Sequence, residues 1–243
     1  MLRTLIDPIL AAVYPQICHV CRGCVDRHSD GVACADCWST THMFGNDDTL
    51  CNKCGALTKD GLLNSSSRCG KCEDGRYDSA LAFGVYEKAL AATVIRLKKE
   101  PYLPLRVREM ICSRTEKFSC ANNTVIVPVP LSKKRLFERG HNQAEVIGRV
   151  ISEHAQLPFI GNALQRTDRS PMHRIGMDKK AREATVKNSF IASAPRLVNG
   201  KDVLLVDDVF TSGSTASFCA DTLKKNGAAS VTVITLARAV MYS

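Results

Sequence analysis

The sequence predicts an α/β fold, a mostly parallel sheet flanked by helices, preceded by a small cysteine-rich module. Short apolar runs alternate with helical patterns after residue 75, which is typical of a parallel sheet covered on both faces. Before that point, eight of the 12 cysteines form four Cys-x-x-Cys pairs. We therefore expect two domains, residues 1–75 and residues 76–243, in this chain of 243 residues.

The charge of the chain is unevenly divided between these parts. Residues 1–75 contain 7 Lys and Arg against 9 Asp and Glu, while the whole chain carries a formal net charge of +9, so residues 76–243 carry +11. We expect this later part to attract anions. No apolar run approaches the ~20 residues of a membrane span, and no cleaved signal peptide is predicted. The expected location is cytoplasmic.

The cysteine pairs predict structural zinc. The segment from Cys18 to Cys72 has few aliphatic residues and little periodicity, so it needs a metal to fold. In a reducing compartment, grouped Cys-x-x-Cys pairs favour metal binding over disulfides. Tetrahedral zinc takes four thiolates, so eight cysteines predict two zinc ions. The expected ligands are Cys18, Cys21, Cys34, Cys37, Cys51, Cys54, Cys69 and Cys72.

Spacing alone leaves the pairing of these cysteines open. Consecutive pairing closes shorter loops than interleaved pairing and is the arrangement we favour, with His19 and Cys24 as alternative ligands. A structural staple, in which metal binding folds a segment that lacks a core, is favoured over contact with nucleic acid or a partner protein. The net negative charge of the module argues against strong DNA binding. The remaining Cys112, Cys120 and Cys219 lie in or near apolar helical patterns and are expected to be buried.

Hydrophobic periodicity predicts the elements of the second part. The expected strands are Ala80–Tyr86, Thr124–Val129, Val203–Asp207 and Val231–Leu236, and the expected helices are Glu87–Glu100, Gly140–Ala155 and Ser214–Asn226. A short amphipathic helix is expected over residues 2–13. The charged stretch Gln165–Lys187, with Pro171 and Gly176, predicts a mobile loop.

The turn after the third strand predicts a phosphate site. The apolar run Val203–Val206 is followed by two acids and then by hydroxyl-bearing residues around a glycine at the start of a helix. A helix N-terminus offers unpaired N–H groups, hydroxyls add donors, and glycine allows close approach of an anion. The alternative is a capped helix start without a ligand. The candidate phosphate-binding residues are Thr211, Ser212, Gly213, Ser214 and Thr215.

The stretch Val203–Thr215 resembles the signature of type I phosphoribosyltransferases, which bind phosphoribosyl pyrophosphate (PRPP). The resemblance implies that Asp207 and Asp208 hold the ribose, directly or with Mg²⁺, and that the turn holds the 5-phosphate of PRPP or of another ribose 5-phosphate ligand. Carboxylates at a strand end can accept hydrogen bonds from vicinal hydroxyls or share a hydrated magnesium ion.

A basic segment supplies the second half of the predicted site. Val-Pro-Val-Pro at residues 127–130 is followed by Lys133, Lys134, Arg135 and Arg139, a density of cations that suits a pyrophosphate. The alternative is a solvated helix face. Together with Arg-Gly-x-Asn-Gln-Ala at 139–144, this pattern resembles the ComF/GntX-like branch of phosphoribosyltransferases, whose members carry an N-terminal zinc module. That branch usually has Phe or Tyr where His141 stands.

The resemblance implies phosphoribosyl transfer to an unidentified acceptor with release of pyrophosphate. Asp207, Asp208 and Arg139 would be catalytic, and Lys133 and Arg135 would bind the diphosphate, mostly by electrostatic stabilisation. The alternative is a non-enzymatic role in DNA uptake during competence, with single-stranded DNA or competence proteins as partners. Aromatic residues are only 6% of the chain and are dispersed, so the sequence predicts no base-stacking surface.

Overall fold

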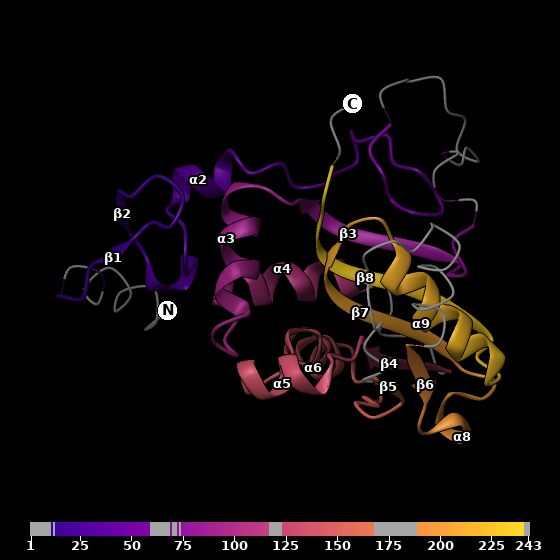
Figure 1. Ribbon diagram of the computed structural model, residues 1–243. Coiled ribbons are helices and arrows are strands. Elements are labelled where there is room, and N and C mark those ends of the chain that lie inside the picture. The colour runs from indigo at the N-terminus through magenta and orange to yellow at the C-terminus, as the bar shows by residue number, and fades with distance from the viewer. Residues whose placement is uncertain are drawn as a thin grey trace, which may run out of the picture.

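The computed structural model describes residue 11 and residues 13–58, 69, 72, 74–116, 123–167 and 189–240 (Figure 1). The expected N-terminal helix over residues 2–13 lies almost wholly outside this part of the chain. Cys120 and most of the expected loop Gln165–Lys187 also lie outside it. Within the described residues, none of the helices is long and apolar enough to cross a lipid bilayer.

A four-stranded parallel sheet forms the centre of the molecule. Its strands lie in the order β3 (Ser79–Val85), β8 (Ser230–Arg238), β7 (Asp202–Phe210) and β4 (Thr124–Pro128), and every neighbouring pair is parallel. The predicted strands are therefore confirmed. Strand β7 continues beyond its predicted end, so the two acids of the signature belong to the strand.

Helices cover both faces of this sheet. Along β7, Leu204 and Val206 face one hydrophobic cluster while Val203 and Leu205 face the other, since successive strand residues point to opposite sides. Helices α3 (Lys88–Leu97), α4 (Leu105–Thr115) and α6 (Gln143–Ala155) contribute to the first cluster, and α9 (Ser214–Lys225) contributes to the second (Figure 1).

The remaining elements are short. They are β1 (Gln16–Ile17), β2 (Cys24–Val25), the 3-10 helix η1 (His28–Asp30), α2 (Ala35–Ser39), α5 (Lys133–Arg139), β5 (Leu164–Arg166), β6 (Phe190–Ala192) and α8 (Pro195–Val198). Helix α4 has no counterpart among the predicted elements. The predicted helix Gly140–Ala155 begins later, because Gly140 adopts a left-handed conformation with φ 72° and Asn142 caps α6.

The two cysteine groups belong to different hydrophobic clusters, which lie on opposite sides of the sheet. Cys18 from the first group and the neighbouring Trp38 belong to the cluster with α3, and Cys51 and Cys54 from the second belong to the cluster with α9. The segment between the two cysteine groups passes the outer edge of β3, where Met43 and Gly84 form an antiparallel bridge. The first cysteine group thus packs on helices α3 and α4 (Figure 1), while the second packs in the cluster of α9.

Two further sequence expectations concern buried cysteines. Cys219 on α9 is fully buried, as predicted, and packs in the second cluster. Cys112 on α4 is only half-buried at the margin of the first cluster. Neither cysteine lies in one of the four-cysteine groups. Both are therefore consistent with small hydrophobic packing residues.

Candidate functional site

The eight paired cysteines gather into two groups of four. In each group the sulfur atoms lie within 4.8 Å of one another, and the groups are Cys18, Cys21, Cys34, Cys37 and Cys51, Cys54, Cys69, Cys72. Consecutive pairing is therefore confirmed, and the interleaved arrangement is wrong. His19 and Cys24 are exposed and belong to neither group.

Backbone amides near the cysteines donate hydrogen bonds to their sulfur atoms. The amide N–H groups of Val20 and Cys34 both donate to Cys18 Sγ at 3.4 Å, and that of Cys69 donates to Cys51 Sγ at 3.2 Å. Burial raises the pKa of Cys18 and of Cys51, but the backbone donors outweigh it and lower both pKa values to about 6. Each group therefore offers four sulfur atoms, and backbone amides stabilise a thiolate in each, which fits tetrahedral zinc.

The predicted phosphate turn joins β7 to α9. Gly213 adopts a left-handed conformation with φ 77°, and α9 begins at Ser214. A Cβ atom at Gly213 would lie 2.6 Å from Cζ of Phe210, so only glycine fits here. A small cavity of about 30 Å³ opens beside the turn, and its polar lining comes from Asp207, Thr211, Thr215 and Thr235.

The two acids at the end of β7 have different surroundings. Asp207 lines the cavity with the turn, and its Oδ1 accepts the amide N–H of Asp208 at 2.9 Å. Asp208 Oδ2 lies 3.7 Å from Lys98 Nζ and 3.5 Å from Gln143 Nε2. Burial and the neighbouring Asp208 charge raise the pKa of Asp207 to about 7. Asp207 therefore faces the turn, whereas Asp208 faces Lys98, the cation that follows α3.

Two residues absent from the predicted site thus contact Asp208. Lys98 follows α3 directly, and the carbonyl of the preceding Leu97 lies 2.7 Å from Nε2 of His141. His141 accordingly links the basic segment to the backbone that carries Lys98. Asn142 caps α6 and donates to the Val129 carbonyl at 3.0 Å, which places Gln143 at the first turn of α6.

The predicted pyrophosphate cations lie on α5. Ser132 caps this helix through the amide of Arg135, and no residue of α5 is buried. Within the described part of the chain, the cation within 4 Å of Asp208 is Lys98, so α5 does not pair with the acids. Lys133, Arg135 and Arg139 therefore belong to an exposed helix beside the site, and their pyrophosphate role stays a prediction.

Comparison with known proteins defines the class of this chain. Residues 9–73 match the double zinc ribbon domain, and residues 164–240 match the phosphoribosyl transferase domain. The chain therefore combines a double zinc ribbon with a phosphoribosyltransferase domain, and relatives named Competence protein F and Competence protein ComFC confirm the resemblance to the ComF/GntX-like branch. The two four-cysteine groups are the zinc-binding sites of the ribbons.

Relatives match along most of the chain. It is 29% identical over 235 residues to Competence protein F of Haemophilus influenzae, covering 91% of this chain and 96% of that protein. It is 28% identical to DNA utilization protein YhgH of Escherichia coli, with 92% and 97% covered, and 25% identical to Competence protein ComFC of Bacillus subtilis, with 90% and 95% covered. A solved structure of glutamine PRPP amidotransferase from B. subtilis shares 20% identity at a TM-score of 0.37, covering 53% of this chain and 26% of that chain.

We expect the purified protein to hold two zinc ions per chain, because each four-cysteine group completes one tetrahedral shell. Elemental analysis measures the ratio directly. The double variant Cys51→Ser with Cys54→Ser should retain one ion, whereas Cys24→Ser, outside both groups, should retain two. A single ion in the unaltered protein would contradict the assignment of two sites.

The raised pKa of Asp207 predicts a pH dependence of stability. Because the folded-state pKa of about 7 exceeds the ordinary 3.8, the protonated carboxyl favours the fold, and this contribution is lost as pH rises through about 7. Urea unfolding with zinc but without magnesium, between pH 5.5 and 7.5, should show a steeper loss of unfolding free energy in the unaltered protein than in Asp207→Asn. Equal slopes would refute the raised pKa.

Proposed function

We propose that this chain binds PRPP together with magnesium and acts as a phosphoribosyltransferase that releases pyrophosphate. The observation that carries the proposal is that Asp207 lines one small cavity together with Thr211, Gly213 and Thr215, at the junction of β7 and α9. A phosphate monoester at the turn would meet backbone N–H groups and hydroxyls, while the adjacent carboxylate would reach the ribose. The net charge of +11 on residues 76–243 favours a polyanionic ligand.

Each part of PRPP has a proposed partner. Asp207 and Asp208 bind the ribose hydroxyls or their magnesium ion, and Thr211, Ser212, Gly213, Ser214 and Thr215 bind the 5-phosphate. The diphosphate would lie toward Lys133, Arg135 and Arg139 of α5, with Lys98 as a further cation near Asp208. These charges would stabilise the departing pyrophosphate as positive charge develops at the ribose carbon.

The division into domains belongs to the same proposal. Residues 1–75 form the zinc-ribbon module, and residues 76–243 form the phosphoribosyltransferase domain, with the cytoplasm as the proposed location. Contacts of the first cysteine group with α3 and α4, and of the second with Arg238 of β8, support packing of the two domains against each other.

Replacing both acids should abolish PRPP binding. The double variant Asp207→Asn with Asp208→Asn keeps side-chain size but removes the charges that magnesium and the ribose hydroxyls require. Isothermal titration calorimetry with Mg²⁺-PRPP should give a measurable affinity for the unaltered protein and none for this variant. Asp221→Asn, which removes a carboxylate near the far end of α9, is the matched control. Unchanged affinity in the double variant would overturn the site assignment.

A second candidate function is single-stranded DNA binding on α5. The Phe137 side chain is 90% exposed, and Lys133, Lys134 and Arg135 on the same helix are exposed as well. An exposed ring among cations offers a base-stacking surface beside phosphate-binding charges. This exposure could not be seen in the sequence. Relatives named for competence and DNA utilization support the same candidate.

Phe137→Ala should weaken binding of a single-stranded oligonucleotide by about fivefold or more, because one stacked base contributes roughly 1 kcal/mol or more. Fluorescence anisotropy at two salt concentrations measures this, and affinity should fall steeply with salt in both proteins. Tyr102→Ala removes another exposed ring, 53% exposed and outside α5, and should leave DNA affinity unchanged. Equal losses in the two variants would argue against a site on α5.

A further inference from the structure

Arg238, near the end of β8, contacts the second zinc ribbon. Its Nη1 donates to the backbone carbonyl of Cys54, and its Nη2 lies 3.5 Å from Cys54 Sγ. Four thiolates around one Zn²⁺ leave a net negative charge, so a guanidinium beside one of the sulfurs is favourable. Arg238 thereby attaches the ribbon to the last strand of the sheet.

The same guanidinium packs against the residue that precedes the phosphate turn. The central carbon of the Arg238 guanidinium lies 4.5 Å from the centroid of the Phe210 ring, and the two residues are register partners on β8 and β7. The backbone on each side is also joined, since the amide of Ala239 donates to the Phe210 carbonyl at 2.9 Å. Arg238 thus bridges the Cys54 sulfur and the Phe210 ring.

The Phe210 ring supports the turn directly. Its edge lies so close to Gly213 that a Cβ atom there would come within 2.6 Å of it. Tyr77 meets the Phe210 ring edge-on at 5.6 Å between centroids, and its hydroxyl also approaches Gly213. A displacement of Phe210 therefore changes the space under the turn.

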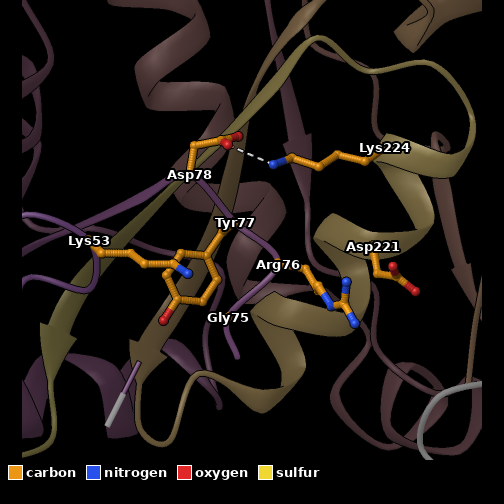
Figure 2. Close-up of a pocket in the computed structure, with 7 residues that line it drawn as sticks. All are labelled: Lys53, Gly75, Arg76, Tyr77, Asp78, Asp221 and Lys224. Atoms are coloured by element: carbon orange, nitrogen blue, oxygen red, sulfur yellow. Dashed lines mark hydrogen bonds and ion pairs between the residues drawn. The ribbon is translucent and has the colours of Figure 1, made fainter. Parts of the chain in front are cut away.

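Tyr77 belongs to the segment through which the chain leaves the second ribbon. Figure 2 shows Lys53 of the ribbon beside the Tyr77 ring, and Asp78 joined to Lys224 of α9, with Nζ to Oδ1 at 2.6 Å. The amide of Arg76 donates to Ser217 Oγ on α9 at 3.0 Å. The exit segment of the ribbon is thus fixed along the helix that the turn begins.

The first ribbon is attached by similar chemistry but at a different place. Arg106 on α4 pairs with Asp30 at 2.9 Å and packs on the Trp38 ring at 5.3 Å. These residues lie with the cluster of α3 and α4, on the face of the sheet opposite α9. An arginine therefore anchors each ribbon, but only the second anchor touches a residue beside the turn.

We propose that Arg238 is a positioning residue that couples zinc in the second ribbon to the phosphate turn, so that zinc and the phosphoribosyl ligand bind cooperatively. The proposal rests on the proposed function, because it takes the turn as the site of the 5-phosphate. The path runs from the Cys54 thiolate through Arg238 and Phe210 to Gly213. Coupling between binding sites is reciprocal, so PRPP must protect this zinc ion as much as the ion strengthens PRPP binding.

The experiment compares Arg238→Gln with Arg106→Gln in the zinc-loaded full chain. We expect Arg238→Gln to weaken Mg²⁺-PRPP binding by about tenfold in calorimetry, a typical size for coupling between sites. In the unaltered protein, PRPP should slow the transfer of one of the two zinc ions to a chromogenic chelator. Arg238→Gln should remove this protection. Arg106→Gln should preserve both the PRPP affinity and the protection.

A ligand-free measurement separates this inference from the proposed function. Hydrogen exchange at the amides of residues 211–215 should speed up in Arg238→Gln but not in Arg106→Gln. If the unaltered protein fails to bind PRPP, the proposed function and the cooperativity with PRPP are both wrong, and the exchange result alone decides whether Arg238 positions the turn. Unchanged exchange at the turn together with unchanged PRPP affinity would overturn the coupling.

A second variant covers the case in which Arg238→Gln does not fold with two zinc ions. Arg238→Lys keeps the positive charge near Cys54 but loses the planar group that packs on Phe210. It should retain two zinc ions and still show faster exchange at the turn. Exchange equal to that of the unaltered protein would contradict the role of the Arg238–Phe210 contact.

Discussion

The position of β7 inside a parallel sheet is the constraint on which the candidate site depends. With β4 on one side, β8 on the other and a hydrophobic cluster on each face, β7 is apolar from Val203 to Val206. Asp207 and Asp208 follow this buried run, where the burial of the strand becomes only partial. The tight turn at Gly213 then starts α9 beside them, so burial of the strand brings acids, hydroxyls and helix N-terminus together.

The parts of the site that are contiguous in sequence were predictable, and the parts joined by tertiary contacts were not. The acids, the turn and the start of α9 form one run, so their chemistry could be interpreted before the fold was known. Lys98 and Gln143 reach Asp208 only because α3 and α6 pack on the same face of the sheet. Lys98 ends an ordinary amphipathic pattern, and nothing in its local sequence marks it as a neighbour of the acids.

The cysteine-rich part shows the same division between local and tertiary information. Short Cys-x-x-Cys spacing predicted the eight ligands, and the shorter loops of consecutive pairing favoured the arrangement that the structure has. Sequence alone suggested one module in front of a second domain. The first ribbon instead packs on α3 and α4 through Trp38, and the second packs in the cluster of α9 through Cys54. Their roles can therefore differ, although their ligand chemistry is the same.

The electrostatics of the paired acids support the proposal of a ligand that brings its own cation. Burial and the charge of Asp208 make the charged form of Asp207 costly, and the cation contacting Asp208 is Lys98, with its Nζ 3.7 Å away. Without a ligand, Asp207 lowers this cost by retaining a proton near neutral pH. A magnesium ion carried in by PRPP would replace that proton and satisfy both carboxylates. Inorganic phosphate alone would add negative charge, and Asp207 would still need its proton.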